Sequence, residues 1–393
     1  MEIEYPQKTE KAKRLKSAVP IAIKVIIITF SVLINVLFYT LRMNKNVMIF
    51  ATERISSPIR SVLVRINSIF PFSMMEILLT ISGIWAIVYL TRSVVFSIRR
   101  RESKLLLKCI VTISCVCLYG WGAFCWLWNS YYYAPGYAEK YSFQSVNVNL
   151  ENLYEVTKLF AHKSNELAAL MERDSDGNII SNKDDIFEKS TGIYETLFDE
   201  FPGIKTQLYR PKPMIYSWLM SRTGYTGIYF ALTGESNINT RAPLLLMPVT
   251  IAHELAHQCG IAAEDEANFI GILACITSDE TKYEYAGYLL GLIHLRNAIL
   301  SEDPEKWVEI TGQMNAKVRA DLQYNNEYWL SQKKVTTGVD FLDNLLTTVT
   351  ETVSDTVNTA YDGYLKSQDQ ELGLRSYGAC VDLLVDYFSK KAA

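Results

Sequence analysis

Several features are scarce or missing in this sequence, and each absence narrows its interpretation. Histidine is scarce, with only 4 in 393 residues. No internal repeat or low-complexity segment is evident, so neither a repeat array nor a disordered chain is indicated. After residue 128, 22 basic residues stand against 36 acidic ones, a net charge of −14, which argues against nucleic-acid binding by bulk electrostatics. That part has no C-x-x-C pair, and an odd number of cysteines is interpreted as packed thiols: Cys259, Cys275 and Cys380.

Long apolar runs are what the first third of the chain does contain. Residues 18–41, 76–98 and 105–128 are each long enough to cross a bilayer as a helix. A cleaved signal peptide is the alternative for the first run, and a buried helix of a soluble protein is the alternative for each of the three. The sequence therefore predicts a multi-pass membrane protein, with residues 1–128 as a membrane anchor and residues 129–393 as a separate domain.

The distribution of basic residues predicts how the anchor is oriented. The connection between the second and third runs holds Arg99, Arg100, Arg101 and Lys104, which is typical of a cytoplasmic loop. Alternation then puts residues 129–393 outside the cytoplasm, with the lipid bilayer as a partner. One feature disagrees with the rule, because the predicted outer segment 42–73 also holds basic residues: Arg42, Lys45, Arg54, Arg60 and Arg65.

A metal-binding motif stands near the middle of the predicted outer domain. His253 and His257 belong to an H-E-x-x-H sequence, and residues four apart lie one above the other on a helix, so both imidazoles can reach one ion. Zn²⁺ suits such a site, and Glu254 is placed to act as general base on a zinc-bound water. The alternative is a chance occurrence on a surface helix, which so few histidines make improbable.

A carboxylate is expected as the third metal ligand. Gly260 is a plausible end for the first helix, and a second helix is expected to start near Ala263 with acidic residues in its first turn. We predict Glu266 as the ligand, with Glu264 as its rival, although both acids could simply favour the helix N-terminus. Asn268 is expected to orient a ligand.

These residues also carry a resemblance to known families. His253 to His257 followed by Glu266-Ala267-Asn268 resembles the gluzincin pattern of zinc metallopeptidases. More closely, HELAHQCGIAAEDEANF resembles a bacterial membrane family, domain of unknown function 3810, as do the TGESNIN segment, the aromatic patch after the last apolar run and the terminal SYG…DLL stretch. The resemblance covers nearly the whole chain and implies a membrane-anchored, zincin-like domain. Two features depart from the patterns: Glu266 follows His257 by only nine positions, and Ala263 stands where metzincins have a third histidine.

The remaining pattern predicts a mostly α-helical, α+β domain with a small sheet. Helices are expected over 145–172, 184–201, 284–300, 303–330, 335–366 and 377–388. Met214–Tyr216 and Gly227–Leu232 read as strands, the latter as a sheet edge that could pair with extended substrate, and 237–239 as a possible hairpin return. A tyrosine from the C-terminal side could steady an oxyanion, and five are available: Tyr283, Tyr285, Tyr288, Tyr361 and Tyr377.

Three functions fit these residues to different degrees. The favoured one is a membrane-anchored zinc metallopeptidase that cleaves peptides or proteins of the cell envelope, with His253, His257 and Glu266 holding the metal. The alternative is a non-catalytic, zinc-containing protein that binds an envelope partner, although such a site needs no base at position 254. An intramembrane protease is disfavoured, because Arg241 and Glu264 flank the motif too closely for a membrane span.

Overall fold

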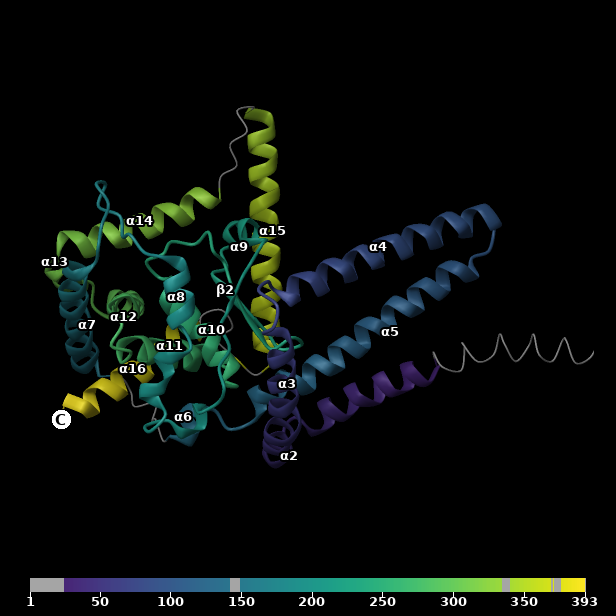
Figure 1. Cartoon of the computed structure of the whole chain (residues 1–393), viewed down its shortest axis with the longest axis horizontal. Helices are drawn as coiled ribbons and strands as arrows, with labels where there is room; N and C mark the ends of the chain where they lie inside the picture. Colours follow the sequence, from purple (N-terminus) through teal and green to yellow (C-terminus); the bar gives the residue numbers. More distant parts are fainter. Residues whose placement is uncertain (1–24, 142–148, 334–339, 369, 371–375, 393) are drawn as a thin grey trace, which may run out of the picture.

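The structure, a computed structural model, describes residues 25–141, 149–333, 340–368, 370 and 376–392. Two long helices project from the rest of the molecule as a hairpin (Figure 1): α4 (Met74–Arg100) and α5 (Lys104–Leu127). Both are long and apolar enough to cross a membrane, and only 11% of the apolar window of each is buried. They match the second and third predicted spans within a few residues. Because most of their apolar side chains are exposed, the alternative that they are buried helices of a soluble protein is disfavoured.

The first predicted span lies only partly within the described residues. A shorter apolar helix covers Val25–Leu41, and residues 18–24 are outside the part that the structure describes. It leaves the molecule on the same side as α4 and α5 (Figure 1). Because this helix falls short of the length that the other two reach, the third span stays a prediction.

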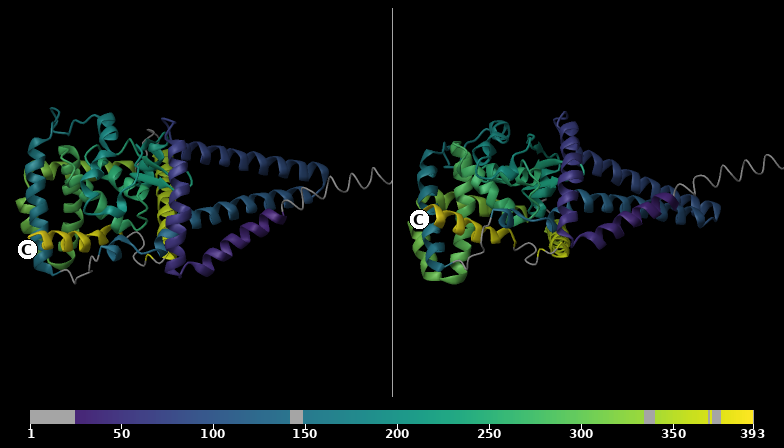
Figure 2. Two further views of the ribbon diagram at one scale, coloured as in Figure 1. Left: turned by 60° about the horizontal axis from the view of Figure 1, so that its bottom comes forward. Right: turned by 90° about the horizontal axis from the view of Figure 1, so that it is seen from below.

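The segment between the first two predicted spans is helical and not a simple loop. It forms α2 (Lys45–Phe50), a π-helical stretch (Ala51–Ser56) and α3 (Ser57–Asn67), which follow one another without a break. Figure 2 shows this rod lying crosswise to α4 and α5, between them and the remaining domain. Sequence analysis predicted no helix here, because the segment is rich in β-branched and basic residues and contains Pro58. The wider π-helical turn also interrupts the helical period.

The domain after residue 128 is a packed set of helices with one small sheet. Its central helices are α7 (Leu150–Leu170), α10 (Met247–Gln258), α11 (Glu264–Ile276), α12 (Thr281–Glu302) and α16 (Ser376–Ala392). These five supply most of its main apolar core, to which the surrounding segments add further side chains, and α10 and α11 lie almost wholly inside it. Around them lie α6 (Tyr137–Lys140), α8 (Lys183–Lys189), α9 (Ser217–Thr223), α13 (Pro304–Gln313), α14 (Ala316–Gln332) and α15 (Asp340–Ser367). Short 3₁₀ turns cover Asn129–Tyr133, Gly192–Leu197 and Pro202–Ile204.

The sheet confirms the predicted hairpin and edge strand. Strand β2 (Gly227–Phe230) pairs antiparallel with β3 (Glu235–Ile238), and β1 (Lys212–Pro213) pairs parallel with β3, giving the order β1-β3-β2. β2 is therefore an edge, and it runs along α10. The prediction of a strand at 214–216 was wrong, because the chain turns into α9 there. The helix expected over 184–201 breaks into α8 and a 3₁₀ turn, and that over 303–330 divides before Ala316.

Candidate metal centre

Helix α10 buries the two histidines of the H-E-x-x-H motif side by side. Pro248 is tolerated in its first turn, because the main-chain N–H that proline lacks would have no partner within the helix there. Apolar residues around the motif are buried, so the helix lies in the core. The rings of His253 and His257 have centroids 4.7 Å apart and are nearly perpendicular. One turn of helix therefore brings the two imidazoles together, as the spacing predicts.

Each histidine is oriented by a contact on its Nδ1 atom. Nδ1 of His253 lies 2.9 Å from Oδ1 of Asn268, and Nδ1 of His257 lies 2.6 Å from the main-chain oxygen of Ile261. Both partners offer oxygen acceptors, so each Nδ1 carries a proton and each Nε2 is the ring atom that is available to a metal. The expectation that Asn268 orients a ligand agrees with this contact.

Glu264 supplies the third group of the cluster. Its Oε2 atom lies 3.1 Å from Nε2 of His253 and 3.6 Å from Nε2 of His257. The three side chains are buried, and the ligand atoms that they offer all lie within 4.8 Å of one another. Burial lowers the pKa of His257, but the Glu264 carboxylate, together with Glu254 and the main-chain oxygen of Ile261, outweighs it, so the pKa is raised to about 9. Two imidazoles hold the pKa of Glu264 well below its ordinary value despite burial.

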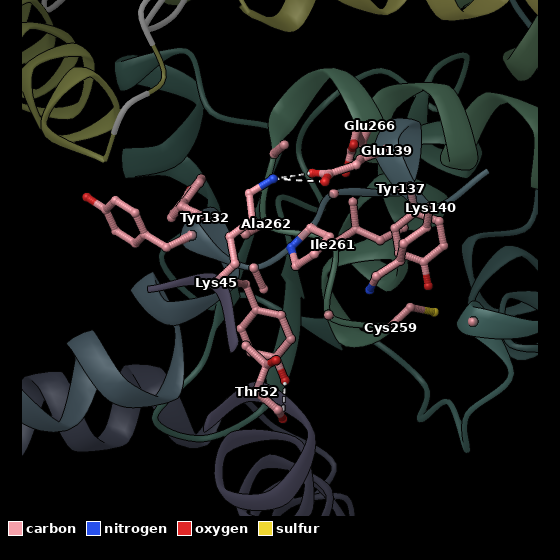
Figure 3. A pocket seen from close by; sticks show the side chains of 18 of the residues that line it. Lys45, Thr52, Tyr132, Tyr137, Glu139, Lys140, Cys259, Ile261, Ala262 and Glu266 are labelled. Atoms are coloured by element: carbon pink, nitrogen blue, oxygen red, sulfur yellow. Dashed lines mark hydrogen bonds and ion pairs between the residues drawn. The ribbon is translucent and has the colours of Figure 1, made fainter. Parts of the chain in front are cut away.

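Glu266, the predicted third ligand, does not lie with the histidines. Its Oε1 atom accepts a hydrogen bond from the main-chain N–H of Ala138 at 2.9 Å, and it faces a different pocket beside Tyr137 and Glu139 (Figure 3). Side chains two positions apart on a helix point in directions about 200° apart, so only one of Glu264 and Glu266 can face α10. The structure thus brings Glu264, the rival named in the sequence analysis, to the two histidines and leaves the predicted Glu266 apart from them.

The face of α11 that meets α10 carries Glu264, Asn268 and Gly271 in an i, i+4, i+7 pattern. Gly271 permits the close approach, because a Cβ atom there would lie 2.9 Å from the main-chain nitrogen of His253. Backbone contact between the two helices is what lets a carboxylate in the first turn of α11 reach the imidazoles. This spacing is the signal that separates Glu264 from Glu266 in the sequence.

Glu254 is buried next to the cluster and beside the edge strand. A Cβ atom on Gly227 of β2 would lie 2.6 Å from Oε1 of Glu254, so this glycine makes room for the carboxylate. Oε2 of Glu254 has no hydrogen-bond partner among the described residues. Burial raises the pKa of Glu254 to about 7, with the two histidines opposing the rise. A carboxylate with such a pKa can accept or release a proton near neutral pH.

The C-terminal end of α10 is held by Gly260 and by Arg60, and sequence analysis missed Arg60 as part of the site. Gly260 has φ +92°, and its N–H donates to the main-chain oxygen of His257. Arg60 of α3 donates to the same oxygen at 3.2 Å and is buried. Its guanidinium also lies near the rings of Trp128, Tyr131 and Tyr229. It donates hydrogen bonds to the hydroxyls of the two tyrosines. No pattern in the sequence links position 60 with position 257.

Among the tyrosines considered for an oxyanion role whose side chains the structure describes, Tyr361 reaches the site. The hydroxyl of Tyr361 on α15 donates to Oε1 of Glu264 at 2.6 Å. Tyr283 and Tyr285 are bonded elsewhere, to the main-chain oxygen of Ile186 and to Asp321. The side chain of Tyr377 lies outside the described residues. Tyr361 thus contacts Oε1 of Glu264, while the two imidazoles contact Oε2 of the same carboxylate.

A cavity of about 330 Å³ opens beside His253 and Glu254. Most of its wall is apolar, with side-chain amides from α11, α14 and α15 among the lining groups. Its lining includes Leu246, Met247, Val249, Leu290, Trp329, Asn268, Asn325 and Asn358. Gly227 of the edge strand borders the same space, so the cavity connects β2 with the candidate metal centre.

Fold and site together define a mostly helical protein with two helices of membrane-spanning length and a buried His-His-Glu cluster. Residues 51–385 match the family model described as protein of unknown function (DUF3810). The chain belongs to this family, as the resemblance of its sequence implied. No curated protein and no solved structure matches it.

Proposed function

We propose that this protein is a membrane-anchored zinc metallopeptidase whose metal is held by His253, His257 and Glu264. The proposal is carried by one observation: three ligand atoms of the types that zinc prefers converge, buried, within 4.8 Å of one another. The residues fit the metal in two further ways. Both imidazoles are held by their Nδ1 atoms with Nε2 directed toward the same carboxylate, and an ionised Glu264 balances part of a dication's charge.

The chemistry divides between the metal and Glu254. A bound zinc ion would polarise a peptide carbonyl and lower the pKa of water to about 7. Glu254 takes a proton from the attacking water and returns it to the leaving amine, a role suited to its raised pKa and to the unpartnered Oε2 atom. Tyr361 and Asn268 keep Glu264 and His253 in place through their hydrogen bonds.

Substrate binding is assigned to β2 and the adjoining cavity. An edge strand offers main-chain groups that can pair with an extended peptide, and β2 is such an edge next to Glu254. The neighbouring cavity is lined mainly by apolar side chains and has room for one large residue of the peptide. The substrate class that follows is an extended peptide segment with an apolar residue next to the cleaved bond.

The anchor and its orientation are part of the proposal. The rod α2–α3 touches the domain, for example where the Nδ2 group of Asn67 donates to the main-chain oxygen of Thr233 at 2.8 Å. Segment 42–73 and the domain therefore share one side of the membrane, and the basic turn at Arg101 lies at the far end of the hairpin. With that turn in the cytoplasm, the candidate metal centre faces the cell envelope.

The decisive experiment separates an enzyme from a zinc-containing scaffold. Full-length protein in detergent is assayed for bound zinc and for hydrolysis of a mixed peptide library, alongside Glu254→Gln and His253→Ala. Glu254→Gln keeps the size of the side chain and removes its basicity. We expect it to retain zinc and to lose hydrolysis by about 10²–10⁴-fold. His253→Ala should lose metal and hydrolysis together.

The exposed Glu302 of α12 provides the matched control, since Glu302→Gln makes the same change away from the site. It should leave both measurements as in the wild type. Cleavage by Glu254→Gln at the wild-type rate would overturn the peptidase assignment and leave the zinc with a structural role. Absence of zinc from the wild-type protein after growth with zinc would overturn the metal assignment itself.

A further inference from the structure

Helix α15 exposes a row of large apolar side chains along most of its length. Leu345, Leu346, Val349, Val353 and Val357 are 48, 40, 48, 43 and 38% exposed. The residues follow the helical period, so they form one stripe, called here the α15 stripe. A row of this size on a soluble surface is unusual and indicates contact with something apolar.

The direction of the α15 stripe follows from Tyr364. This residue comes seven positions after Val357 and eighteen after Leu346, which is close to two and to five turns of helix, so it lies on the same face. Its ring has its centroid 6.0 Å from that of Phe124, near the end of α5, and its hydroxyl donates to Asn129 at 2.7 Å. The stripe therefore faces the side on which the apolar hairpin leaves the domain.

Other exposed apolar side chains occur at the same level of the molecule. Figure 2 shows α15 and the rod α2–α3 lying crosswise to α4 and α5, in the layer between these helices and the domain. In that layer Tyr216, the residue before α9, contacts α4, where its hydroxyl lies 3.0 Å from that of Thr80. Exposed apolar residues next to α3 and α9 include Ile66, Ile69, Ile215, Trp218 and Leu219. Exposed apolar groups thus lie on α3, α9 and α15 or in the segments next to them, near the base of the hairpin.

The opposite face of α15 is polar and belongs to the approach to the candidate metal centre. Glu351, Ser354 and Asp355 line a cavity between α9, α14 and α15, and Asn358 lines both this cavity and the one beside His253. From Asp343 to Asp362 the helix has four acidic residues and no basic one. Attraction to anionic headgroups is therefore excluded as the source of binding, and apolar burial is left.

We propose that α15 lies in the headgroup layer of the bilayer, with the α15 stripe among the upper acyl chains. The partner is the lipid surface itself, and zwitterionic lipid suffices. This inference rests on the proposed membrane anchor, and it does not rest on metal or catalysis. Its consequence is that the cavity walled by the polar face of α15 opens at the membrane surface, so the substrate is a peptide segment close to the bilayer.

Depth-dependent quenching tests the proposal on the full chain in vesicles. An environment-sensitive fluorophore is attached to Val349→Cys or Val353→Cys on the stripe, and to Thr348→Cys or Thr359→Cys, exposed positions about 80–140° round the same helix from these two. The parent chain with its own cysteines, labelled in parallel, is the blank. Vesicles of phosphatidylcholine, with or without phosphatidylglycerol, carry a nitroxide at carbon 5 of one acyl chain.

We expect the two stripe positions to be quenched at least about twofold more than the two threonine positions, equally in both lipid mixtures. Stripe labels that emit as in water would overturn the inference, as would stripe labels that are shielded from water but not quenched by the nitroxide lipid, because protein would then cover the stripe. Equal quenching of all four positions would overturn the sidedness. Flotation of the vesicles is measured first, since protein that does not float with lipid contradicts the proposed anchor and not this inference alone.

Discussion

The guanidinium of Arg60 donates to the main-chain oxygen of His257, joining the segment between the first two apolar runs to the helix of the candidate metal centre. A cation at the C-terminal end of a helix is favoured by the helix dipole. Here the cation is buried under the rings of Trp128, Tyr131 and Tyr229, which also attract it. The rod α2–α3 and the candidate metal centre are therefore one structural unit.

Removal of this charge should destabilise the domain. Arg60→Met keeps an apolar stem but leaves the His257 oxygen and the hydroxyls of Tyr131 and Tyr229 without their charged donor. Since each hydrogen bond to a charged group contributes about 1.5–3 kcal/mol, we expect a loss of at least about 2 kcal/mol in the free energy of unfolding. Arg65→Met, on the exposed side of the same helix, is the control. Thermal unfolding in detergent measures both, and equal midpoints would contradict the assigned role.

The basic residues in segment 42–73 are the feature that disagrees with the proposed orientation. Arg42 donates to the hydroxyl of Tyr133 at 2.8 Å, Lys45 pairs with Glu139 at 2.8 Å, and Arg60 is buried. Three of the five basic residues thus make contacts within the protein. In the turn at Arg101, by contrast, Arg100 lies over the ring of Phe96, and no basic side chain forms an ion pair with another described residue, so this turn is the stronger topological signal.

The orientation can be tested with two reporter fusions. A phosphatase that is active only outside the cytoplasm should be active when fused after Ala393 and inactive when inserted at Glu102, between α4 and α5. The reason is that the rod and the domain are in contact, which places them on one side, while Glu102 lies at the opposite end of the hairpin. Activity at Glu102 together with inactivity after Ala393 would invert the orientation.

Much of the site could be predicted from local sequence, and the rest depends on packing. The H-E-x-x-H spacing suffices to bring His253 and His257 together, because both lie on one helix. The choice between Glu264 and Glu266 depends on which face of α11 meets α10, and that is decided by the close approach at Gly271. Arg60 lies 197 positions from its partner, and no local rule connects residues so far apart.

The ligand assignment gives opposite expectations for the two glutamates. Glu264→Ala should lower zinc affinity by more than about 100-fold, since loss of a partner outside the ligand set already costs about 10–100-fold. Glu266→Ala should keep its zinc and instead lose about 1–3 kcal/mol of stability, because the Ala138 N–H is left without its acceptor. Competition with a chelator and thermal unfolding measure the two effects. The reverse pattern would restore Glu266 as the ligand.

Close packing of α10 on α11 predicts the effect of a single methyl group. A Cβ atom at Gly271 would press on the backbone of His253, and neither helix backbone can move without disturbing the core. We expect Gly271→Ala to cost about 1–3 kcal/mol of stability and to weaken zinc binding. Gly312→Ala in α13 is the control, because nothing lies within 4 Å of its Cβ position and alanine favours a helix. A Gly271→Ala protein as stable as Gly312→Ala would refute the packing argument.

The hydroxyl of Tyr361 predicts a link between α15 and the metal that can be measured without any substrate. Tyr361→Phe removes the hydrogen bond to Oε1 of Glu264 and keeps the ring in place. Loss of such a partner leaves the carboxylate less firmly oriented, and we expect zinc affinity to fall by about 10–100-fold. Tyr364→Phe is the matched control three residues later, since its hydroxyl bonds to Asn129 and not to the cluster. Chelator competition on both variants decides the point: similar zinc affinities for Tyr361→Phe, Tyr364→Phe and the wild type would mean that α15 does not support the metal ligand.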